Sequence, residues 1–501
     1  MPDFLKKKEN LLLILLLIIA VFLRFYHIRD YIVFLGDEGR DMIVMRKIFS
    51  QRDIPFLGPT ASVGGFYLGP IYYWMAAPFL LISVFDPVGP AYMVAILGVL
   101  TTFILFRFIK DTIGFWPAFL TGLIYAVDPL ILRYSRSSWN PNPLPLFALL
   151  LFYFIYLAIV RKKLRYFLFS GACLGIAVQL HYLAIILAAL AALAVLLNIK
   201  IKDLLKAVSL AAFGFLITFS PFLLFELRNN FPNFHTIFQF VTRGTTVRYN
   251  ETNIIANVFN LGNAFMEELT RSRNNILTKI TFLVLTFSGI FVIVRQYRYF
   301  DKKVFLTISL IWFFGGLLFL RLYTGQIHDY YYGFMFPAPF LLFAIFLSIL
   351  WNKTFLKITA LILTAFIFVY FAFNGYFRTP PNRQIDQTKD IANIVMQNAA
   401  NSPYNFALIS DNNSDHAYRY FLETGGKKPT ELEELVTGQL LVICESKVCE
   451  PLGNSSWEIA GFGRAEIERV WNLENYGIKI YRLTHWPGTP SPEGKPAQKG
   501  G

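Results

Sequence analysis

Long apolar runs separated by short polar segments fill most of the chain. A helix needs about 20 predominantly apolar residues to cross a bilayer. On this basis we expect about eleven spanning helices and an all-α polytopic membrane domain over residues 1–377. The predicted spans lie near residues 10–28, 90–108, 116–132, 143–160, 166–182, 183–199, 204–225, 276–294, 303–321, 333–351 and 355–375.

Composition agrees with this pattern. Of the 501 residues, 55% are hydrophobic and 17% aromatic, and the mean hydropathy of +0.49 is high for a soluble protein. A cleaved signal peptide is a poor explanation, because the first apolar run is one of many and no small-residue cleavage site leads into a soluble chain. We therefore expect the first run to remain as an anchor in the cell membrane.

The net charge of +14 is concentrated in the gaps between apolar runs. Every second gap is basic, which is the positive-inside pattern and assigns these gaps to the cytoplasm. We therefore expect a cytoplasmic N-terminus, an extracytoplasmic C-terminus and no nucleic-acid partner. The basic segments are residues 6–8, 107–110, 161–165, 200–206, 295–303 and 353–357.

Residues 69–85 are apolar enough to compete as a further span. Counting them as one would invert every later loop and place the basic residues 161–163 outside, so we predict a helix in the membrane interface. The outer face then receives a loop over residues 29–89, a turn at 132–143 and a long loop over 226–275.

Beyond residue 377 the hydropathy falls, and the pattern predicts a small extracytoplasmic α/β domain over residues 378–485. The run "RTPPNRQIDQTKDIANIVMQNAANSPYNFALISDNN" favours a linker, an amphipathic helix and a buried strand, in that order. "HAYRYFLETGG" favours another helix that ends at glycine, and "QLLVICE" and "GIKIYRL" favour strands. The tail over residues 486–501 is rich in Pro, Gly and Lys and is predicted to be disordered.

The three cysteines give little information about the function of the chain. Cys173 lies in an apolar helix, where a small packing residue is expected. Cys444 and Cys449 either pair in an oxidising compartment or stay free, and the sequence leaves both alternatives open.

The stretch "FLGDEGRDM" places Asp37 and Glu38 just beyond the first anchor. A carboxylate held in a partly desolvated cleft can act as a general base. The alternative is an ordinary polar loop, since an acidic pair by itself is weak evidence.

Arginines and aromatic residues also gather at the predicted outer face. Positive-inside bias should deplete arginine there, and a guanidinium suits a lipid phosphate, although snorkelling or pairing with loop acids is an equal alternative. Rings at this boundary can stack on sugars or line an isoprenoid groove, but an interface belt explains most of them. The arginines are Arg133, Arg136, Arg228 and Arg321, and the candidate aromatic residues are Tyr72, Tyr73, Trp139 and Tyr330.

The remaining candidates are isolated. His181 at the outer end of a span could bind a phosphate, although a lone histidine is more often structural, and His328 with Asp329 could form a ligand pair. No His/Asp/Glu set has the spacing of a firm metal site. The sequence contains no phosphate-cradling glycine motif and no nucleophile elbow, which argues against ATP hydrolysis and serine hydrolase chemistry.

With this layout, the chain resembles the C-type glycosyltransferases that use polyprenyl-phosphate sugars, a group that includes protein O-mannosyltransferases and lipid A aminoarabinose transferases. The resemblance covers most of residues 10–375. An Asp-Glu pair follows the first span, and the element "PIYYW" at residues 70–74 follows in the same loop. "LRYSRSSW" then resembles the start of the second outer loop, and "YYYGFMFPAP" resembles the start of a late span.

The resemblance implies a mechanism. Asp37, with Glu38 beside it, would take a proton from the acceptor as it attacks the anomeric carbon with inversion. Arg136 and Arg228, assisted by His181, would hold the departing lipid phosphate. Arg133, Arg321 and Tyr73 are further candidates for the lipid phosphate. The candidates for substrate binding are Trp139, Asn140, Asn142, Tyr72, Asp329 and Tyr330.

Two departures from the family pattern matter. Leu68-Gly69 stands where relatives often carry a basic residue, and Asn140 and Asn142 stand near the place of a second carboxylate. Losing that carboxylate weakens a divalent-metal site. We therefore expect transfer without a metal or other cofactor.

The sequence thus predicts a membrane glycosyltransferase. Its expected partners are a polyprenyl-phosphate-linked sugar donor, an extracytoplasmic acceptor that is a glycan, a lipid or a protein, and membrane lipids. The alternative is a transporter or flippase of lipid-linked sugars, but the chain shows neither two similar halves nor many charges at membrane depth.

Overall fold

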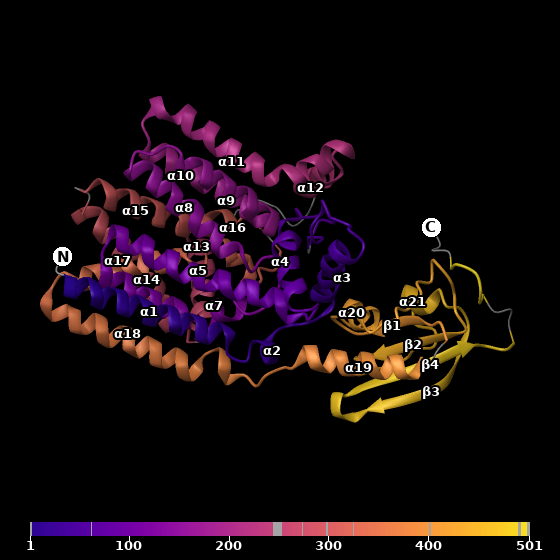
Figure 1. Cartoon of the computed structure of the whole chain (residues 1–501). Helices are drawn as coiled ribbons and strands as arrows, with labels where there is room; N and C mark the ends of the chain where they lie inside the picture. The colour runs from indigo at the N-terminus through magenta and orange to yellow at the C-terminus, as the bar shows by residue number, and fades with distance from the viewer. Residues whose placement is uncertain are drawn as a thin grey trace. The chain divides into compact units, whose positions relative to one another are not determined.

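The computed structural model describes residues 3–61, 63–243, 253–272, 274–296, 299–323, 325–399, 402–488 and 492–497. Contacts divide the chain into two compact units. Unit 1 comprises residues 1–28 and 53–381, and unit 2 comprises residues 29–52 and 382–501. Both are coloured by position along the chain in Figure 1.

Unit 1 is built of helices that run side by side (Figure 1). Every one of the predicted spans coincides with a helix or with two or three consecutive helical segments, which confirms the all-α prediction for this part of the chain. These elements are α1 (Asp3–Phe25), α5 (Val88–Thr112), α6 (Phe115–Val127), α7 (Pro129–Tyr134), α8 (Leu144–Val160), α9 (Tyr166–Leu180), η1 (Tyr182–Ile185), α10 (Ile186–Asn198), α11 (Ile201–Arg228), α14 (Asn275–Gln296), α15 (Phe300–Leu310), η2 (Ile311–Gly315), α16 (Gly316–Leu320), η3 (Asp329–Met335), α17 (Ala338–Trp351), α18 (Thr354–Asn374) and η4 (Tyr376–Arg378).

Four helical stretches among the described residues are long and apolar enough to cross a membrane alone. They cover Val88–Thr112, Ile201–Arg228, Phe300–Leu320 and Thr354–Arg378. A fifth would be the pair η3 and α17, which bends by 60°. Several other predicted spans are apolar helices of 10–17 residues, shorter than the prediction assumed.

Shorter helices occupy the predicted outer segments. α4 (Ile71–Ile82) is the helix that we expected at the interface, and α12 (Pro232–Arg243) and α13 (Ile254–Thr270) lie in the predicted loop over residues 226–275. Residues 244–252 and 273 of that loop lie outside the described part of the chain.

Unit 2 contains a four-stranded sheet in the order β1-β2-β4-β3. β1 pairs with β2 in parallel, and the other pairs are antiparallel. β2 is buried along its whole length, because it lies between two strands and its sequence "QLLVIC" is almost continuously apolar. The elements of this unit are α2 (Ile28–Tyr31), α3 (Gly36–Ser50), α19 (Gln384–Asn398), β1 (Asn405–Ile409), α20 (His416–Thr424), β2 (Gln439–Cys444), α21 (Trp457–Ala460), β3 (Ala465–Leu473), η5 (Glu474–Tyr476) and β4 (Ile478–His485).

The division into units departs from the predicted domains. Residues 29–52, expected in a loop of the membrane domain, cluster instead with the C-terminal domain. The side chain of Arg29 pairs with Asp386 at 2.7 Å, and the Phe34 N–H donates to Gln384 at 2.9 Å. The segment that carries Asp37 and Glu38 is therefore part of the α/β unit.

Two other details of unit 2 were not predicted. β3 was missed because most of its residues are exposed and none is buried, so it lacks the pattern of a buried strand. In the predicted tail, Ala497 donates its N–H to the Leu432 carbonyl at 2.8 Å, and Gly494 donates to Val436 at 2.9 Å. Residues 492–497 are thus placed against the domain rather than disordered, whereas 489–491 and 498–501 lie outside the described residues.

Candidate active site

The acidic pair lies in the first turn of α3. Leu35 occupies the N-cap in an extended conformation, and its N–H donates to Glu38 Oε2 at 3.0 Å. A side chain at N3 that reaches back in this way satisfies a backbone donor that the helix leaves unpaired. Carboxylates in the first turn also interact favourably with the positive end of the helix dipole.

Glu38 and Asp37 have opposite environments. Glu38 is buried, and this burial, with a smaller contribution from the Asp41 and Asp37 carboxylates, raises its pKa to about 8 despite the hydrogen bond from Leu35. The Asp37 side chain is 57% exposed. Only Asp37 therefore presents a carboxylate that a substrate can reach from solvent.

Arg40 orients Asp37. Its guanidinium pairs with Asp37 Oδ1 at 3.0 Å and with the buried Asp41 at 2.9 Å. One cation thus joins an exposed carboxylate to a buried one on the same face of α3, which restricts the rotamers of Asp37.

The glycines that frame the acidic pair permit close packing. A Cβ on Gly39 would lie 2.3 Å from the Ala417 nitrogen, and one on Gly36 would lie 1.9 Å from Ser414 Oγ. Both distances are too short for any side chain, so this spacing lets α3 rest directly on the start of α20.

A polar network fixes the N-terminus of α3. The Gly36 N–H donates to Asn413 Oδ1 at 2.9 Å, and Asn413 Nδ2 donates to the Glu445 carboxylate at 3.2 Å. Tyr418 donates to the same carboxylate at 2.7 Å. Asn413 and Glu445 thus connect the end of β2 with the residue that precedes Asp37.

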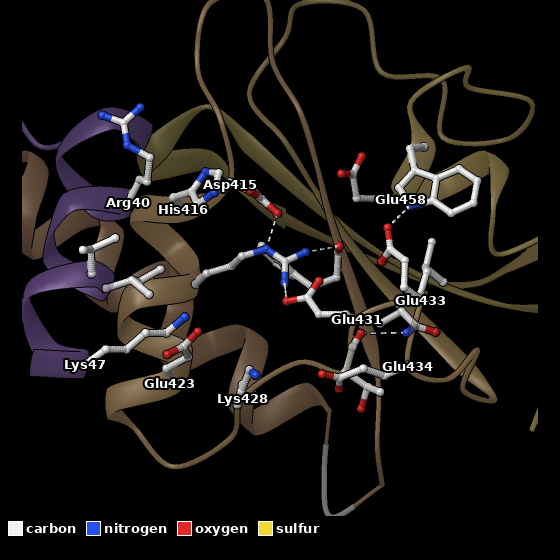
Figure 2. Close-up of a pocket in the computed structure, with 18 residues that line it drawn as sticks. Arg40, Lys47, Asp415, His416, Glu423, Lys428, Glu431, Glu433, Glu434 and Glu458 are labelled. Carbon is white, nitrogen blue, oxygen red and sulfur yellow. Dashed lines mark hydrogen bonds and ion pairs between the residues drawn. The ribbon is translucent and has the colours of Figure 1, made fainter. Parts of the chain in front are cut away.

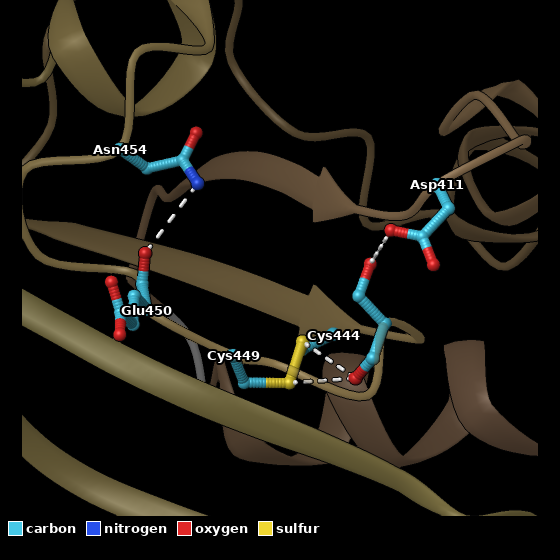
Figure 3. Close-up of a disulfide and its surroundings, with 6 residues drawn as sticks. Asp411, Cys444, Cys449, Glu450 and Asn454 are labelled. Atoms are coloured by element: carbon cyan, nitrogen blue, oxygen red, sulfur yellow. Dashed lines mark hydrogen bonds between the residues drawn. A yellow bond between two sulfur atoms is a disulfide. The ribbon is translucent and has the colours of Figure 1, made fainter.

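A disulfide closes the loop that carries Glu445. Cys444 and Cys449 form a disulfide. Of the two alternatives that the sequence left open, the structure therefore has the paired one. Figure 3 shows this disulfide beside a hydrogen bond in which the Ser446 hydroxyl donates to Asp411 Oδ1 at 3.0 Å. The loop is therefore tied covalently and by hydrogen bonds, and it supports the network around Asn413.

In unit 1, a charged group forms around Asp329, the first residue of η3. Arg133 pairs with Asp329 at 2.7 Å, and the Tyr134 hydroxyl donates to the other carboxylate oxygen at 2.6 Å. Glu268 of α13 belongs to the same group, because burial and then the Asp329 carboxylate raise its pKa. The Arg133 side chain stays 55% exposed, so it can also meet a ligand from solvent.

Aromatic rings extend from this group. Trp139 contacts Tyr330 with ring centroids 4.6 Å apart, and His181 contacts Tyr330 at 5.7 Å and Tyr331 at 5.5 Å. His181 Nδ1 accepts the Leu183 N–H at 3.3 Å, so in the neutral ring the proton lies on Nε2 and can be donated. The structure thus brings the predicted residues Arg133, Trp139, His181, Asp329 and Tyr330 into one cluster.

Arg136 lies apart from solvent. It is fully buried, and it donates to the carbonyls of Leu23 and Tyr26 while its guanidinium lies over the ring of Phe377 at 4.8 Å. These contacts tie the end of α1 to η4, which favours a structural role over direct phosphate binding.

The other predicted site residues are mostly buried. Asn140 donates to Leu180 at 2.7 Å and Asn142 to Ser137 at 2.5 Å, and Tyr72, Tyr73 and Arg321 are also buried. Arg228, the last residue of α11, is exposed. Within the described ranges, no three His, Cys, Asp or Glu side chains group as a metal site would require.

Four residues of the two sites were missed from the sequence. Arg40 follows Asp37 by three residues, and this helical spacing was a usable signal. No local sequence signal pointed to Asn413, Glu445 or Glu268. Only the tertiary structure brings each of them close to residues that are far away in the chain.

Part of the chain is similar to a known family. Residues 68–225, about a third of the chain, match the model of the dolichyl-phosphate-mannose-protein mannosyltransferase family. A comparison with curated proteins gave no sequence match.

Solved structures match nearly the whole chain. ArnT from Cupriavidus metallidurans bound to undecaprenyl phosphate has a TM-score of 0.63 at 12% identity, with 96% of this chain and 99% of that chain covered. The archaeal oligosaccharyltransferase AglB from Archaeoglobus fulgidus, in complex with an inhibitory peptide and a dolichol-phosphate, has a TM-score of 0.55 at 13% identity, covering 88% and 70%. The family match and the shared fold support a glycosyltransferase activity and confirm the predicted resemblance. The chain is a multi-pass membrane protein with the C-type glycosyltransferase fold.

Proposed function

We propose that this protein transfers a sugar from a polyprenyl-phosphate carrier to an extracytoplasmic acceptor with inversion of the anomeric centre. The observation that carries the proposal is the contrast within α3, where Asp37 is exposed and oriented by Arg40 while its neighbour Glu38 is buried and has a raised pKa. Adjacent carboxyl groups with such different environments are typical of residues with different roles.

The proposed reaction is a single displacement. Asp37 accepts the proton of the acceptor hydroxyl or amine as its oxygen or nitrogen bonds to the anomeric carbon. The bond from that carbon to the phosphate oxygen breaks, and the electron pair leaves with the polyprenyl phosphate. A phosphate is a fair leaving group, so the reaction needs no general acid.

Cationic side chains of unit 1 would stabilise the departing phosphate. The exposed arginines Arg133 and Arg228 are the better candidates, and His181 can donate from Nε2. Arg136 would act through its contacts with α1 and η4. This assignment shifts the emphasis from Arg136 to Arg133, because the contacts of Arg136 are with backbone carbonyls.

The reaction would take place outside the cytoplasm without a metal ion. The bridge between Cys444 and Cys449 supports this location, since disulfides persist in oxidising compartments. The side chains of Asn140 and Asn142 bond to backbone carbonyls, and they replace a carboxylate that a hard divalent cation would favour.

The decisive experiment uses a labelled polyprenyl-phosphate sugar and membranes that contain the protein. Asp37→Asn should lower the rate of transfer by roughly 10²–10⁴-fold, whereas Glu38→Gln, which imitates the protonated side chain, should retain the wild-type rate. Transfer by Asp37→Asn at the rate of the wild type would remove Asp37 as the base.

A second measurement tests the metal requirement. Transfer should persist after treatment with EDTA. A loss of transfer that added manganese or magnesium restores would overturn the metal-free reaction.

A further inference from the structure

Unit 2 contains a hollow of about 570 Å³ beside the helix that carries Asp37. It lies between α3, α20, the loop before β2 and α21, and Figure 2 shows its side chains. Arg40 and Lys47 of α3 form one side, and Trp457 and Glu458 of α21 lie on another. Its volume is in the range of ligand pockets, which is about 300–1,000 Å³.

The lining is strongly polar. It contains six carboxylates and four permanent cations, and few aliphatic side chains. Pockets for acyl chains or drug-like molecules are predominantly apolar, so this hollow suits a hydrophilic ligand. The carboxylates are Asp415, Glu423, Glu431, Glu433, Glu434 and Glu458, and the cations are Arg40, Lys47, Arg419 and Lys428.

Several of these charges are already compensated. Arg419 pairs with Asp415 and, at 2.7 Å, with Glu431, as the dashed lines in Figure 2 show. Glu423 pairs with Arg46 at 3.5 Å. Glu433, Glu434 and Glu458 also line the hollow, so its six carboxylates outnumber its four cations by two.

Trp457 provides an aromatic surface in the lining of the hollow. Its indole N–H donates to Glu433 at 2.9 Å, which fixes the orientation of the ring, and the residue is half-buried. An oriented aromatic face beside carboxylates and a guanidinium offers stacking together with many donors and acceptors for hydroxyl groups. The excess of carboxylates over cations in the lining adds a preference for an amino group.

We propose that this hollow binds the acceptor, and that the acceptor is a glycan that carries free amino groups. The proposal rests on the proposed function, because it gives that reaction its acceptor class. Arg40 contacts Asp37 and also lines the hollow, so a glycan held here has its near end beside the proposed base.

Binding by the full-length protein in nanodiscs tests the proposal by calorimetry. The probes are a glucosamine hexamer, its N-acetylated counterpart and a mannose hexamer. The glucosamine hexamer should bind at least tenfold more tightly than the other two. Equal binding of all three, or no binding of the glucosamine hexamer, would overturn the proposal.

Variants locate the binding. Trp457→Ala and Glu434→Gln should each weaken binding of the glucosamine hexamer by about tenfold or more. The controls are Trp486→Ala, an exposed tryptophan of the same unit that does not line the hollow, and Glu474→Gln in η5, which has the same change of charge. Equal losses in variants and controls would reject the hollow as the site, and Glu434→Gln keeps the test valid if Trp457→Ala fails to fold.

Two further measurements separate this proposal from the reaction itself. Asp37→Asn should bind the glucosamine hexamer as the wild type does, so a failure of Asp37 as the base would leave the binding result unchanged. A lysine-rich peptide should neither bind nor displace the hexamer. Binding of the peptide without binding of any glycan would show that the hollow takes a protein acceptor and would overturn the proposal.

Discussion

The two units hold their candidate residues in different ways. In unit 2, Asp37 is held by local contacts within α3 and by a polar network to Asn413 and Glu445. In unit 1, Arg133 and Asp329 are nearly two hundred residues apart and meet across a cluster of aromatic rings. Asp37 thus lies on a short helix fixed within an α/β unit, whereas Arg133 is held within a bundle of apolar helices.

From this difference we expect the two units to affect different steps of the reaction. A base has to be oriented toward a proton, and a helix held at its N-terminus does this well. A phosphate has to be surrounded by charge, and residues from several helices can do that. Changes in unit 2 should therefore affect the rate of the chemical step, and changes in unit 1 should affect binding of the donor.

The largest expected effect concerns the base. Asp37→Asn should lower kcat by roughly 10²–10⁴-fold, the usual contribution of a general base, and should leave the donor KM within about twofold. Steady-state kinetics with a labelled donor measure both. A large rise in the donor KM with an unchanged kcat would mean that Asp37 acts in binding of the donor and not as the base.

The second effect concerns the donor phosphate. Arg133→Gln should raise the donor KM by about tenfold, because one charge-assisted hydrogen bond contributes about 1.5–3 kcal/mol and part of this is lost to solvent at an exposed position. The control is Arg161→Gln, an exposed arginine that pairs with Asp111 at 3.4 Å in a predicted cytoplasmic gap. Similar KM values for the two variants would contradict a phosphate role for Arg133.

A smaller effect tests the network in unit 2. Asn413→Ala removes the acceptor of the Gly36 N–H, and it should lower kcat by about threefold to tenfold without changing the donor KM. Amide hydrogen exchange over residues 34–42 should become faster. Asn398→Ala, which removes one side-chain bond to the Ile394 carbonyl elsewhere in the unit, serves as the control and should change neither value.

The smallest effect on transfer concerns Glu38. Its pKa in the folded protein is about 8, above the value of 4.5 of an ordinary glutamate, so the folded state binds the proton more tightly. The contribution of Glu38 to stability is therefore fully present below about pH 4.5 and decreases as the pH rises toward 8. Glu38→Gln should remove this decrease and keep transfer near the wild-type rate.

Thermal unfolding of the full chain between pH 5 and 9 measures the difference between Glu38→Gln and the wild type. Parallel curves for the two proteins would mean that Glu38 does not titrate in this range. They would also weaken the contrast between Glu38 and Asp37.

Much of the fold could be predicted from the sequence. Each apolar run became a helix, because hydrophobic length is a local property that backbone hydrogen bonding converts into a helix. The strands β1, β2 and β4 were predicted from their buried pattern. β3 was not, because its residues are mostly exposed, and the pattern of burial was the only signal available.

The site was predicted less completely. Asp37 was chosen from its position after the first span and from the family resemblance, and its exposure agrees with that choice. Arg136 was weighted above Arg133, but sequence could not show that Arg136 is buried against carbonyls while Arg133 is exposed. Burial depends on how helices pack, and adjacent arginines in one turn have similar sequence contexts.

The sequence by itself determined where the helices form, the charge alternation along the chain and the presence of an acidic pair beyond the first anchor, because length, hydropathy and charge act locally. Only the tertiary structure decided that this pair belongs to the α/β unit, that Glu38 is buried while Asp37 is exposed, and that a polar hollow lies beside them. These features depend on contacts such as that between Gly36 and Asn413, residues far apart in the chain, and no local pattern specifies such a contact.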